Sequence, residues 1–230
     1  DKIKYVVVDD LPSEVKSPKK GWHENHARDQ FQRNSMERGY KDCHDNDIIM
    51  ISDIDEIPNP KKLNEFDIKN KYACFLQKNF QSKINLLNVT DGDWPGTKIC
   101  QKKNLKSPQW LRNIKSKKYP FWRIDTFFSK KKYSNLYHIK DGGWHFTCIR
   151  TPEDLESKLL NFAHHYEFEE SGLKIGDIRK FISEKKVMYD HNIDQKGYKW
   201  SGKSMLKTYD TKLLPKYIYS NIDKFSKWLD

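Results

Sequence analysis

The sequence lacks long apolar runs and closely spaced cysteines. No stretch approaches the roughly 18 consecutive apolar residues that a membrane-spanning helix needs, so the sequence predicts no such span. The four cysteines, Cys43, Cys74, Cys100 and Cys148, lie far apart without a CxxC spacing, which argues against a zinc site. Internal repeats and low-complexity linkers are also missing. We therefore predict that residues 1–230 form a single domain, since this length suffices for one sizeable α/β core.

Acidic residues are outnumbered by basic ones. The chain has 43 Lys and Arg against 32 Asp and Glu, giving a formal net charge of +11. Such an excess favours anionic partners such as nucleic acid, anionic lipid or phosphorylated substrates, although spread lysines are also typical of a solvated surface. Aromatic residues make up 13% of the chain, so a core can form despite the high charge.

The first sixty residues predict a strand, a helix and a second strand. Residues 5–8 are apolar and end in Asp9 and Asp10, which indicates a buried strand rather than a secretory signal. A helix is predicted over residues 21–39, and the apolar run Ile48–Ile51 predicts a strand buried on both faces. This order suggests a parallel βαβ unit and an α/β fold.

The remainder of the chain is predicted to be irregular first and helical afterwards. Residues 72–76 read as a strand, whereas residues 79–135 indicate short strands and loops. Thr151 can cap a helix in which Pro152 takes the first position. A last helix is predicted from Pro215, so the part from about residue 151 onward reads as mainly helical.

Three carboxylates, Asp53, Asp55 and Glu56, arrive at the end of the apolar run. Carboxylates beside a buried strand need a cation or strong hydrogen-bond donors, and ligands bind at the carboxyl ends of strands in open α/β sheets. A divalent ion held by carboxylate oxygens, with a substrate phosphate in its shell, fits this pattern. The ordinary alternative is a helix N-cap or a solvated turn.

A second informative segment is Gly142-Gly143-Trp144-His145. The glycines allow a sharp turn or the close approach of a ligand to the backbone. Trp144 offers a flat apolar face that suits a sugar ring, and His145 can ligate a metal or move a proton. The alternative is a tight turn with a core tryptophan and a satisfied histidine.

Two arginines on the predicted helix before the acidic turn, Arg28 and Arg33, are candidates for binding a diphosphate. Asp29 and Arg33 also have the i, i+4 spacing of a helical ion pair. A plain surface ion pair is therefore the alternative interpretation of this segment.

Several blocks in the chain together resemble glycosyltransferase family 17. The short acidic motif alone is weakly specific, but its combination with the later blocks is specific, and the resemblance spans essentially the whole chain. The blocks are KYVVVDDLP at 4–12, RDQFQR at 28–33, ISDIDEIP at 51–58, GGWHF at 142–146, HYEF at 165–168 and LPKY at 214–217.

The resemblance implies a GT-A-like, Rossmann-like α/β fold that lacks the N-terminal strand-helix-strand section of family members. It also implies a UDP-sugar donor, UDP-GlcNAc in the characterised member, and Mn²⁺ or Mg²⁺ bound by Asp53 and Asp55. Such transfer inverts the anomeric carbon with β-linkage, so a carboxylate must deprotonate the acceptor hydroxyl. Glu56 and Glu167 are the candidates for this base, with His145 as a further catalytic residue.

The implied partners are a nucleotide-sugar donor and a glycan or glycoprotein acceptor, as in N-glycan processing. The resemblance implies a Golgi location, whereas a microbial or viral source, which the lysine-rich and asparagine-rich composition indicates, would imply the cytoplasm. Two other classes stay open. One is a haloacid-dehalogenase-like phosphatase with Asp53 as nucleophile. The other is a basic polyanion-binding module, although the sequence carries no RNA-binding signature and no specific nucleic acid is expected.

Overall fold

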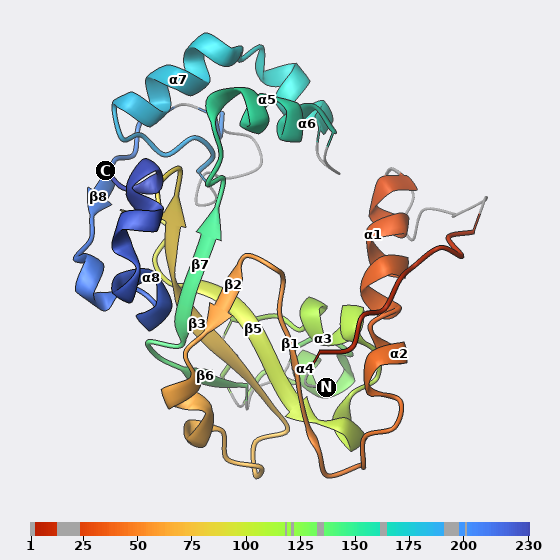
Figure 1. Ribbon diagram of the computed structural model, residues 1–230. Helices are drawn as coiled ribbons and strands as arrows, with labels where there is room; N and C mark the ends of the chain where they lie inside the picture. The colour runs from red at the N-terminus through yellow and green to blue at the C-terminus, as the bar shows by residue number, and fades with distance from the viewer. Residues whose placement is uncertain are drawn as a thin grey trace. The chain divides into compact units, whose positions relative to one another are not determined.

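The computed structural model describes residues 3–12, 24–117, 119–120, 122–132, 136–161, 165–190, 198–200 and 202–230. The chain is mixed α/β with a curled, mixed sheet, as Figure 1 shows. The strands are β1 (Ile48–Ile51), β2 (Glu56–Pro58), β3 (Tyr72–Gln81), β4 (Leu86–Asn88), β5 (Trp94–Gln101), β6 (Tyr137–Ile139), β7 (Gly143–Thr147) and β8 (Leu206–Thr208). The α-helices are α1 (Glu24–Asn34), α2 (Glu37–Tyr40), α3 (Pro108–Asn113), α4 (Asp125–Phe128), α5 (Pro152–Asn161), α6 (His165–Ser171), α7 (Ile175–Ser183) and α8 (Lys216–Ser220). Short 3₁₀ helices are η1 (Pro60–Glu65), η2 (Lys102–Asn104), η3 (Thr211–Leu213) and η4 (Ile222–Trp228).

The chain divides into two compact units. The first consists of Asp1–Ile51, Glu65–Cys74 and Thr97–His138, and the second of Ser52–Asn64, Phe75–Gly96 and Ile139–Asp230. Hydrogen-bonded strands follow the order β1-β5-β3-β4-β8, with β3 and β5 contributing residues to both units. That residues 1–230 act as one glycosyltransferase domain stays a prediction. Within the described ranges, no helix is long and apolar enough to cross a membrane.

In the first unit, β1 pairs antiparallel with β5, from Ile48 opposite Gln101 to Ile51 opposite Lys98. Ile51 is buried, whereas Ile48 is 52% exposed. The apolar run is therefore a strand, as predicted, but one of its faces is covered less than the other. Its buried side chains join a cluster formed by Ile49, Ile51, Tyr72, Cys74, Cys100, Leu111, Ile114 and Leu136.

Two predictions for the first sixty residues are wrong. Residues 5–8 form no strand, and the side chains of Tyr5 and Val7 are 90% and 70% exposed. β-Branched residues favour an extended backbone but cannot supply a surface to pack against, and the segment is held to α2 by an ion pair of Asp10 with Arg38 at 2.6 Å. The parallel βαβ unit is consequently not formed, because β1 pairs antiparallel with β5.

The helix predicted over residues 21–39 is divided into α1 and α2. The hydroxyl of Ser35, between the two helices, donates a hydrogen bond to the carbonyl oxygen of Phe31 at 3.0 Å. Such bonding of a serine to the preceding turn competes with a regular helix. Residues 21–23 lie outside the described part of the chain.

In the second unit, β7 lies between β2 and β3. It pairs antiparallel with β2 and parallel with β3, while β4 pairs antiparallel with both β3 and β8. Helices α5, α6 and α7 lie next to one another (Figure 1) and enclose a core around Leu155, Phe168 and Ile178.

The predicted helix starts in this unit are confirmed. Thr151 Oγ1 accepts a hydrogen bond from the backbone N–H of Asp154 at 3.2 Å, and α5 begins at Pro152. The last predicted helix appears as α8 and η4, and its apolar residues pack against Phe80 of β3. In the last third of the sequence, apolar residues at helical spacing therefore correctly predicted helices whose apolar side chains pack in a core.

Candidate metal and donor site

The acidic motif forms a tight turn between β1 and β2. The backbone N–H of Glu56 donates to the carbonyl oxygen of Asp53 at 3.0 Å, and the hydroxyl of Ser52 donates to the carbonyl oxygen of Glu56 at 3.2 Å. Ile54 at the tip is fully exposed. Asp53 and Asp55 therefore sit on a closed turn that fixes their backbone positions.

Glu56 is buried, with 4% of its surface exposed, and its side chain holds the turn in place. Its Oε2 accepts a hydrogen bond from the backbone N–H of Asp53 at 3.2 Å, and its Oε1 accepts one from the indole N–H of Trp94 at 3.0 Å. These donors stabilise a carboxylate that burial would otherwise disfavour. The geometry gives Glu56 a structural part, and its use as general base stays a prediction.

Three side chains come together because the strands that carry them are in register. His145 of β7 is opposite Glu56 of the antiparallel strand β2 and opposite Asn79 of the parallel strand β3. Residues at matched positions on neighbouring strands point to the same face. The register of β2, β7 and β3 thus places a carboxylate, an imidazole and an amide side by side.

His145 is 6% exposed, and its ring is fixed on several sides. Its Nδ1 lies 2.9 Å from Oδ1 of Asn79, and the ring stacks on Trp94 with centroids 4.4 Å apart and an interplanar angle of 10°. An amide oxygen can only accept, so Nδ1 carries the proton and donates. Nε2 lies 3.7 Å from Oδ2 of Asp55.

Asp55 is partly buried and lies beside the side chain of His145. Its side chain is 35% exposed, and the backbone N–H of Phe146 donates to its carbonyl oxygen at 2.8 Å. Burial by itself would raise the pKa of Asp55, but the imidazole of His145 and the ammonium of Lys158 on α5 outweigh it and lower the pKa below its ordinary value. Asp55 is therefore ionised at neutral pH.

Gly142 and Gly143 allow the strands around His145 to pack closely. A Cβ on Gly143 would lie 2.1 Å from the carbonyl oxygen of Ile57, and its φ is +135°. A Cβ on Gly142 would lie 2.8 Å from Cβ of Phe75. Here the two glycines serve strand packing, and the tight turn considered as an alternative is formed at Lys140 and Asp141, directly before Gly142 and β7. Their contact with a donor stays a prediction.

The other predicted site residues have partners of their own. The indole N–H of Trp144 donates to the carbonyl oxygen of Leu213 at 2.9 Å, and its ring packs with the Phe80 core. Glu167 on α6 accepts a hydrogen bond from the hydroxyl of Tyr189 at 3.2 Å. The roles of Trp144 and Glu167 in binding and catalysis stay predictions.

Arg28 and Arg33 lie on α1 and belong to the first unit. Arg33 contacts Asp29 at 3.0 Å and Gln109 at 2.6 Å, so the ion-pair alternative is realised for this residue. Arg28 is exposed. Binding of a diphosphate by these arginines stays a prediction.

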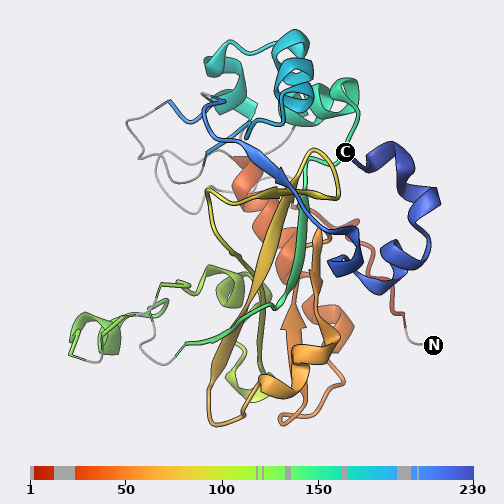
Figure 2. The same cartoon turned by 90° about the vertical axis from the view of Figure 1, so that its left-hand side faces the viewer.

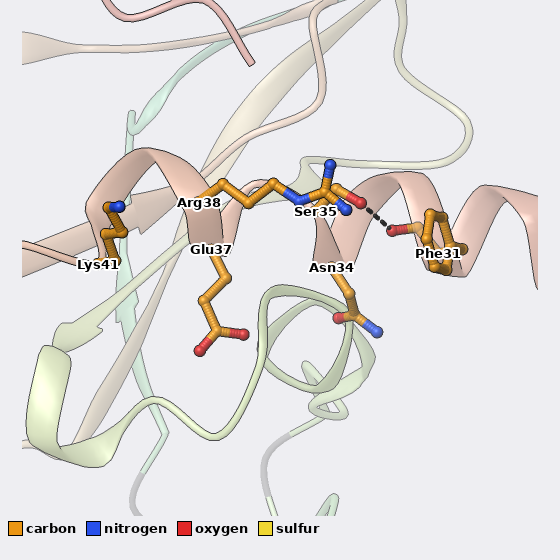
Figure 3. Close-up of a pocket in the computed structure, with 6 residues that line it drawn as sticks. All are labelled: Phe31, Asn34, Ser35, Glu37, Arg38 and Lys41. Atoms are coloured by element: carbon orange, nitrogen blue, oxygen red, sulfur yellow. Dashed lines mark hydrogen bonds between the residues drawn. The ribbon is translucent and has the colours of Figure 1, made fainter. Parts of the chain in front are cut away.

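A separate pocket of about 400 Å³ lies in the first unit at the junction of α1 and α2 (Figure 3). Its arginine, Arg38, already binds Asp10 through two hydrogen bonds of 3.0 and 2.6 Å. None of the predicted site residues lines this pocket, whose lining residues are Phe31, Asn34, Ser35, Glu37, Arg38 and Lys41.

The residues around Asp55 fit a divalent ion in part. A carboxylate oxygen and an imidazole nitrogen are suitable ligands for Mn²⁺, and the bond from His145 to Asn79 is the outer contact that ligating histidines usually make. Within the described ranges, no three His, Cys, Asp or Glu side chains gather into a complete metal site. Phosphate oxygens of a bound nucleotide would have to supply further ligands, as is usual for ions held with substrate phosphates.

Sequence reasoning missed Asn79, Trp94 and Lys158. A signal for Asn79 was present, because Gln77, Asn79 and Gln81 alternate along β3 and all three are buried.

Comparisons with models of protein families, with curated proteins and with solved structures each found no match.

Proposed function

We propose that the chain is a metal-dependent inverting glycosyltransferase with a GT-A-like organisation. It moves a sugar from a UDP-sugar, with UDP-GlcNAc as the first donor to test, to a glycan hydroxyl. The observation that carries the proposal is the pair formed by Asp55 and His145. Their side chains lie 3.7 Å apart at the end of a strand, with Nδ1 of the imidazole held by Asn79. The resemblance of the surrounding blocks to glycosyltransferase family 17 supplies the reaction class.

In this proposal, Asp55 and His145 Nε2 are the ligands that the protein offers to the divalent ion, and Asp53 of the same turn is the further carboxylate that the resemblance implies. A bound Mn²⁺ or Mg²⁺ would neutralise the charge that develops on the leaving diphosphate. Glu56 and Trp94 keep the acidic turn closed, and Asn79 keeps the imidazole in one tautomer. These buried contacts preorganise the ligands before the nucleotide arrives.

The general base is assigned by accessibility. A base must come within hydrogen-bonding distance of the acceptor hydroxyl. Glu56 is buried, and both of its oxygens accept hydrogen bonds from the protein, whereas Glu167 is exposed on α6. We therefore favour Glu167 as the base and Glu56 as a structural residue.

The remaining predicted residues take donor and acceptor roles in the proposal. Arg28 and Arg33 stay candidates for the diphosphate on the resemblance alone, and Arg33 is already engaged by Asp29 and Gln109. Trp144 is partly exposed, so one part of its ring can contact a sugar. Gly142 and Gly143 would act by letting the backbone approach the donor closely.

A transfer assay tests the proposal. The chain is incubated with a panel of nucleotide sugars and glycan acceptors, with Mn²⁺ or with a chelator, and the anomeric configuration of the product is read by NMR. Product with inverted configuration that requires the metal and disappears in Asp53→Asn and Asp55→Asn supports the proposal, and the exposed residue Asp223 gives the control Asp223→Asn. Absence of transfer and of nucleotide-sugar binding under all conditions would refute it.

The same assay separates the two candidate bases. Glu167→Gln should lower kcat strongly, whereas Glu169→Gln, on the same helix and also exposed, should leave it unchanged. Equal activity of both variants would remove Glu167 from the mechanism without removing the metal site.

A further inference from the structure

A short projection of the first unit carries large apolar side chains into solvent. It comprises residues 119, 120 and 122–132, between α3 and β6, and includes α4. Trp122, Ile124 and Phe128 are 67%, 71% and 85% exposed. Figure 2 shows this light-green segment extending away from the strands of its own unit. Exposed large apolar groups that cluster in this way mark interaction surfaces.

The projection is anchored at its base. The indole N–H of Trp110 on α3 donates to the carbonyl oxygen of Lys130 at 2.8 Å, and the backbone N–H of Lys115 donates to the carbonyl oxygen of Lys131 at 2.7 Å. Thr126 is buried, and its hydroxyl donates to the carbonyl oxygen of Arg123 at 2.7 Å. The apolar side chains are thus presented by a folded support.

Positive charge surrounds the apolar side chains. Between residues 115 and 132 the sequence has seven Lys or Arg and a single acidic residue, Asp125. That carboxylate binds Arg123 at 2.7 Å and Lys132 at 2.8 Å. It thus connects a residue that precedes α4 in the sequence with one that follows it. Lys117, just before the projection, and Lys131 within it are exposed, and residues 115–132 together carry a formal net charge of +6, from seven basic residues and one acidic residue.

We propose that this projection docks the protein onto an anionic lipid surface. Trp122, Ile124 and Phe128 enter the interface between headgroups and acyl chains, while the surrounding lysines face the lipid phosphates. Tryptophan and phenylalanine combined with basic residues are the composition of interfacial membrane anchors, and basic side chains near an anionic leaflet add attraction.

A membrane fits this surface better than nucleic acid. Aromatic rings can stack on bases, but Ile124 lies between the two aromatic positions and has no ring to stack, whereas all three side chains partition into a lipid interface. The proposal goes beyond transferase activity and does not depend on it, because no residue of the acidic turn takes part.

Vesicle flotation with the full chain tests the docking surface. Vesicles of phosphatidylcholine are compared with vesicles that also contain phosphatidylserine, and tryptophan fluorescence is recorded in parallel. We expect binding to the anionic vesicles with a blue shift of the emission. The combined variant Trp122→Ser, Ile124→Ser, Phe128→Ser should weaken binding at least about tenfold, since it removes the inserted apolar groups.

A matched control uses equally exposed apolar residues elsewhere in the first unit. Tyr5, Val7 and Ile68 are 90%, 70% and 61% exposed, and the variant Tyr5→Ser, Val7→Ser, Ile68→Ser should bind vesicles like the unchanged chain. The double variant Lys117→Glu, Lys131→Glu should bind more weakly. Because all of these positions are exposed, circular dichroism should show unchanged folding.

Several outcomes would overturn the proposal. They are an absence of binding to anionic vesicles, or equal binding by the apolar variant and the control. Retention on single-stranded DNA without vesicle binding, lost in the apolar variant, would assign the surface to nucleic acid. Dimerisation in sedimentation equilibrium that disappears in this variant, again without vesicle binding, would assign it to a second copy of the chain.

Discussion

Nδ1 of His145 donates a hydrogen bond to Oδ1 of Asn79 at 2.9 Å, and both side chains are buried. The two residues come from parallel neighbouring strands at matched positions. Because the amide oxygen cannot donate, the bond fixes the tautomer and leaves Nε2 facing Asp55. Asn79 thereby determines which ring nitrogen His145 offers to a ligand.

Replacing Asn79 should weaken metal-dependent nucleotide binding. In Asn79→Leu the imidazole loses the acceptor that orients it, and loss of such an outer contact typically lowers metal affinity about 10-fold to 100-fold. Asn79→Asp keeps an acceptor and should retain more of the affinity. Titration calorimetry of UDP with Mn²⁺ measures the effect.

The control for this pair is Gln81→Leu. Gln81 is a buried amide on the same strand and the same face, but it pairs with Thr147 rather than with His145. It should leave the Mn²⁺-dependent affinity unchanged. Equal losses in Asn79→Leu and Gln81→Leu would mean that the effect comes from general disruption of β3.

Glu56→Gln should destabilise the protein. The carboxylate accepts from both Asp53 N–H and Trp94 Nε1–H, and whichever way the amide of Gln is oriented, one of these donors faces an NH₂ group. Leaving a buried donor unsatisfied costs about 1–3 kcal/mol. Urea denaturation at neutral pH measures the change in the free energy of unfolding.

The same variant decides the role of Glu56. If Glu56 were the general base, Glu56→Gln would abolish turnover even under conditions in which the variant is fully folded. A loss of stability with residual turnover, by contrast, agrees with the structural part assigned to it.

Gly143→Ala should be among the most destabilising single changes in β7. The added Cβ would meet the carbonyl oxygen of Ile57 at 2.1 Å in a backbone with φ of +135°, and steric overlap combined with this strain costs about 3 kcal/mol or more. Gly176→Ala on α7 is the control, since its Cβ would meet nothing within 4 Å. That change should stabilise the helix by up to about 1 kcal/mol, and equal effects at both positions would contradict the strand packing described.

The thiol of Cys100 should make stability fall at high pH. It is fully buried, and burial raises its pKa from 9.0 to about 12. Above pH 9 the unfolded chain loses this proton while the folded chain keeps it, so the free energy of unfolding decreases as the pH rises toward 12. Urea denaturation from about pH 8 to about pH 11, a range that spans the ordinary pKa of the thiol, should show a shallower decline for Cys100→Ala. Parallel pH profiles of the two proteins would contradict the burial of the thiol.

Local signals in the sequence predicted local structure well. The apolar run Ile48–Ile51 is a strand, and Thr151 with Pro152 marks the start of α5. These features depend on residues that are close together in the sequence, including helix caps, so they can be predicted from the sequence alone. The acidic turn was likewise found as a turn that follows a strand.

Pairing and tertiary contact were not predictable in the same way. An apolar run does not specify the direction of its partner, and the partner of β1 is β5, which begins in a stretch predicted to be irregular. Residues 5–8 have strand composition but remain exposed. Asn79 and Trp94 reach His145 only through strand register and ring stacking, and no spacing in the sequence reports either contact.

The most direct test of the central claim is calorimetric titration of the full chain with UDP-GlcNAc, with and without Mn²⁺. We expect binding that requires Mn²⁺ and is lost in both Asp53→Asn and Asp55→Asn, with Asp223→Asn unaffected. Binding that is independent of the metal, or that survives in both variants, would contradict the assignment of the acidic turn as the donor site.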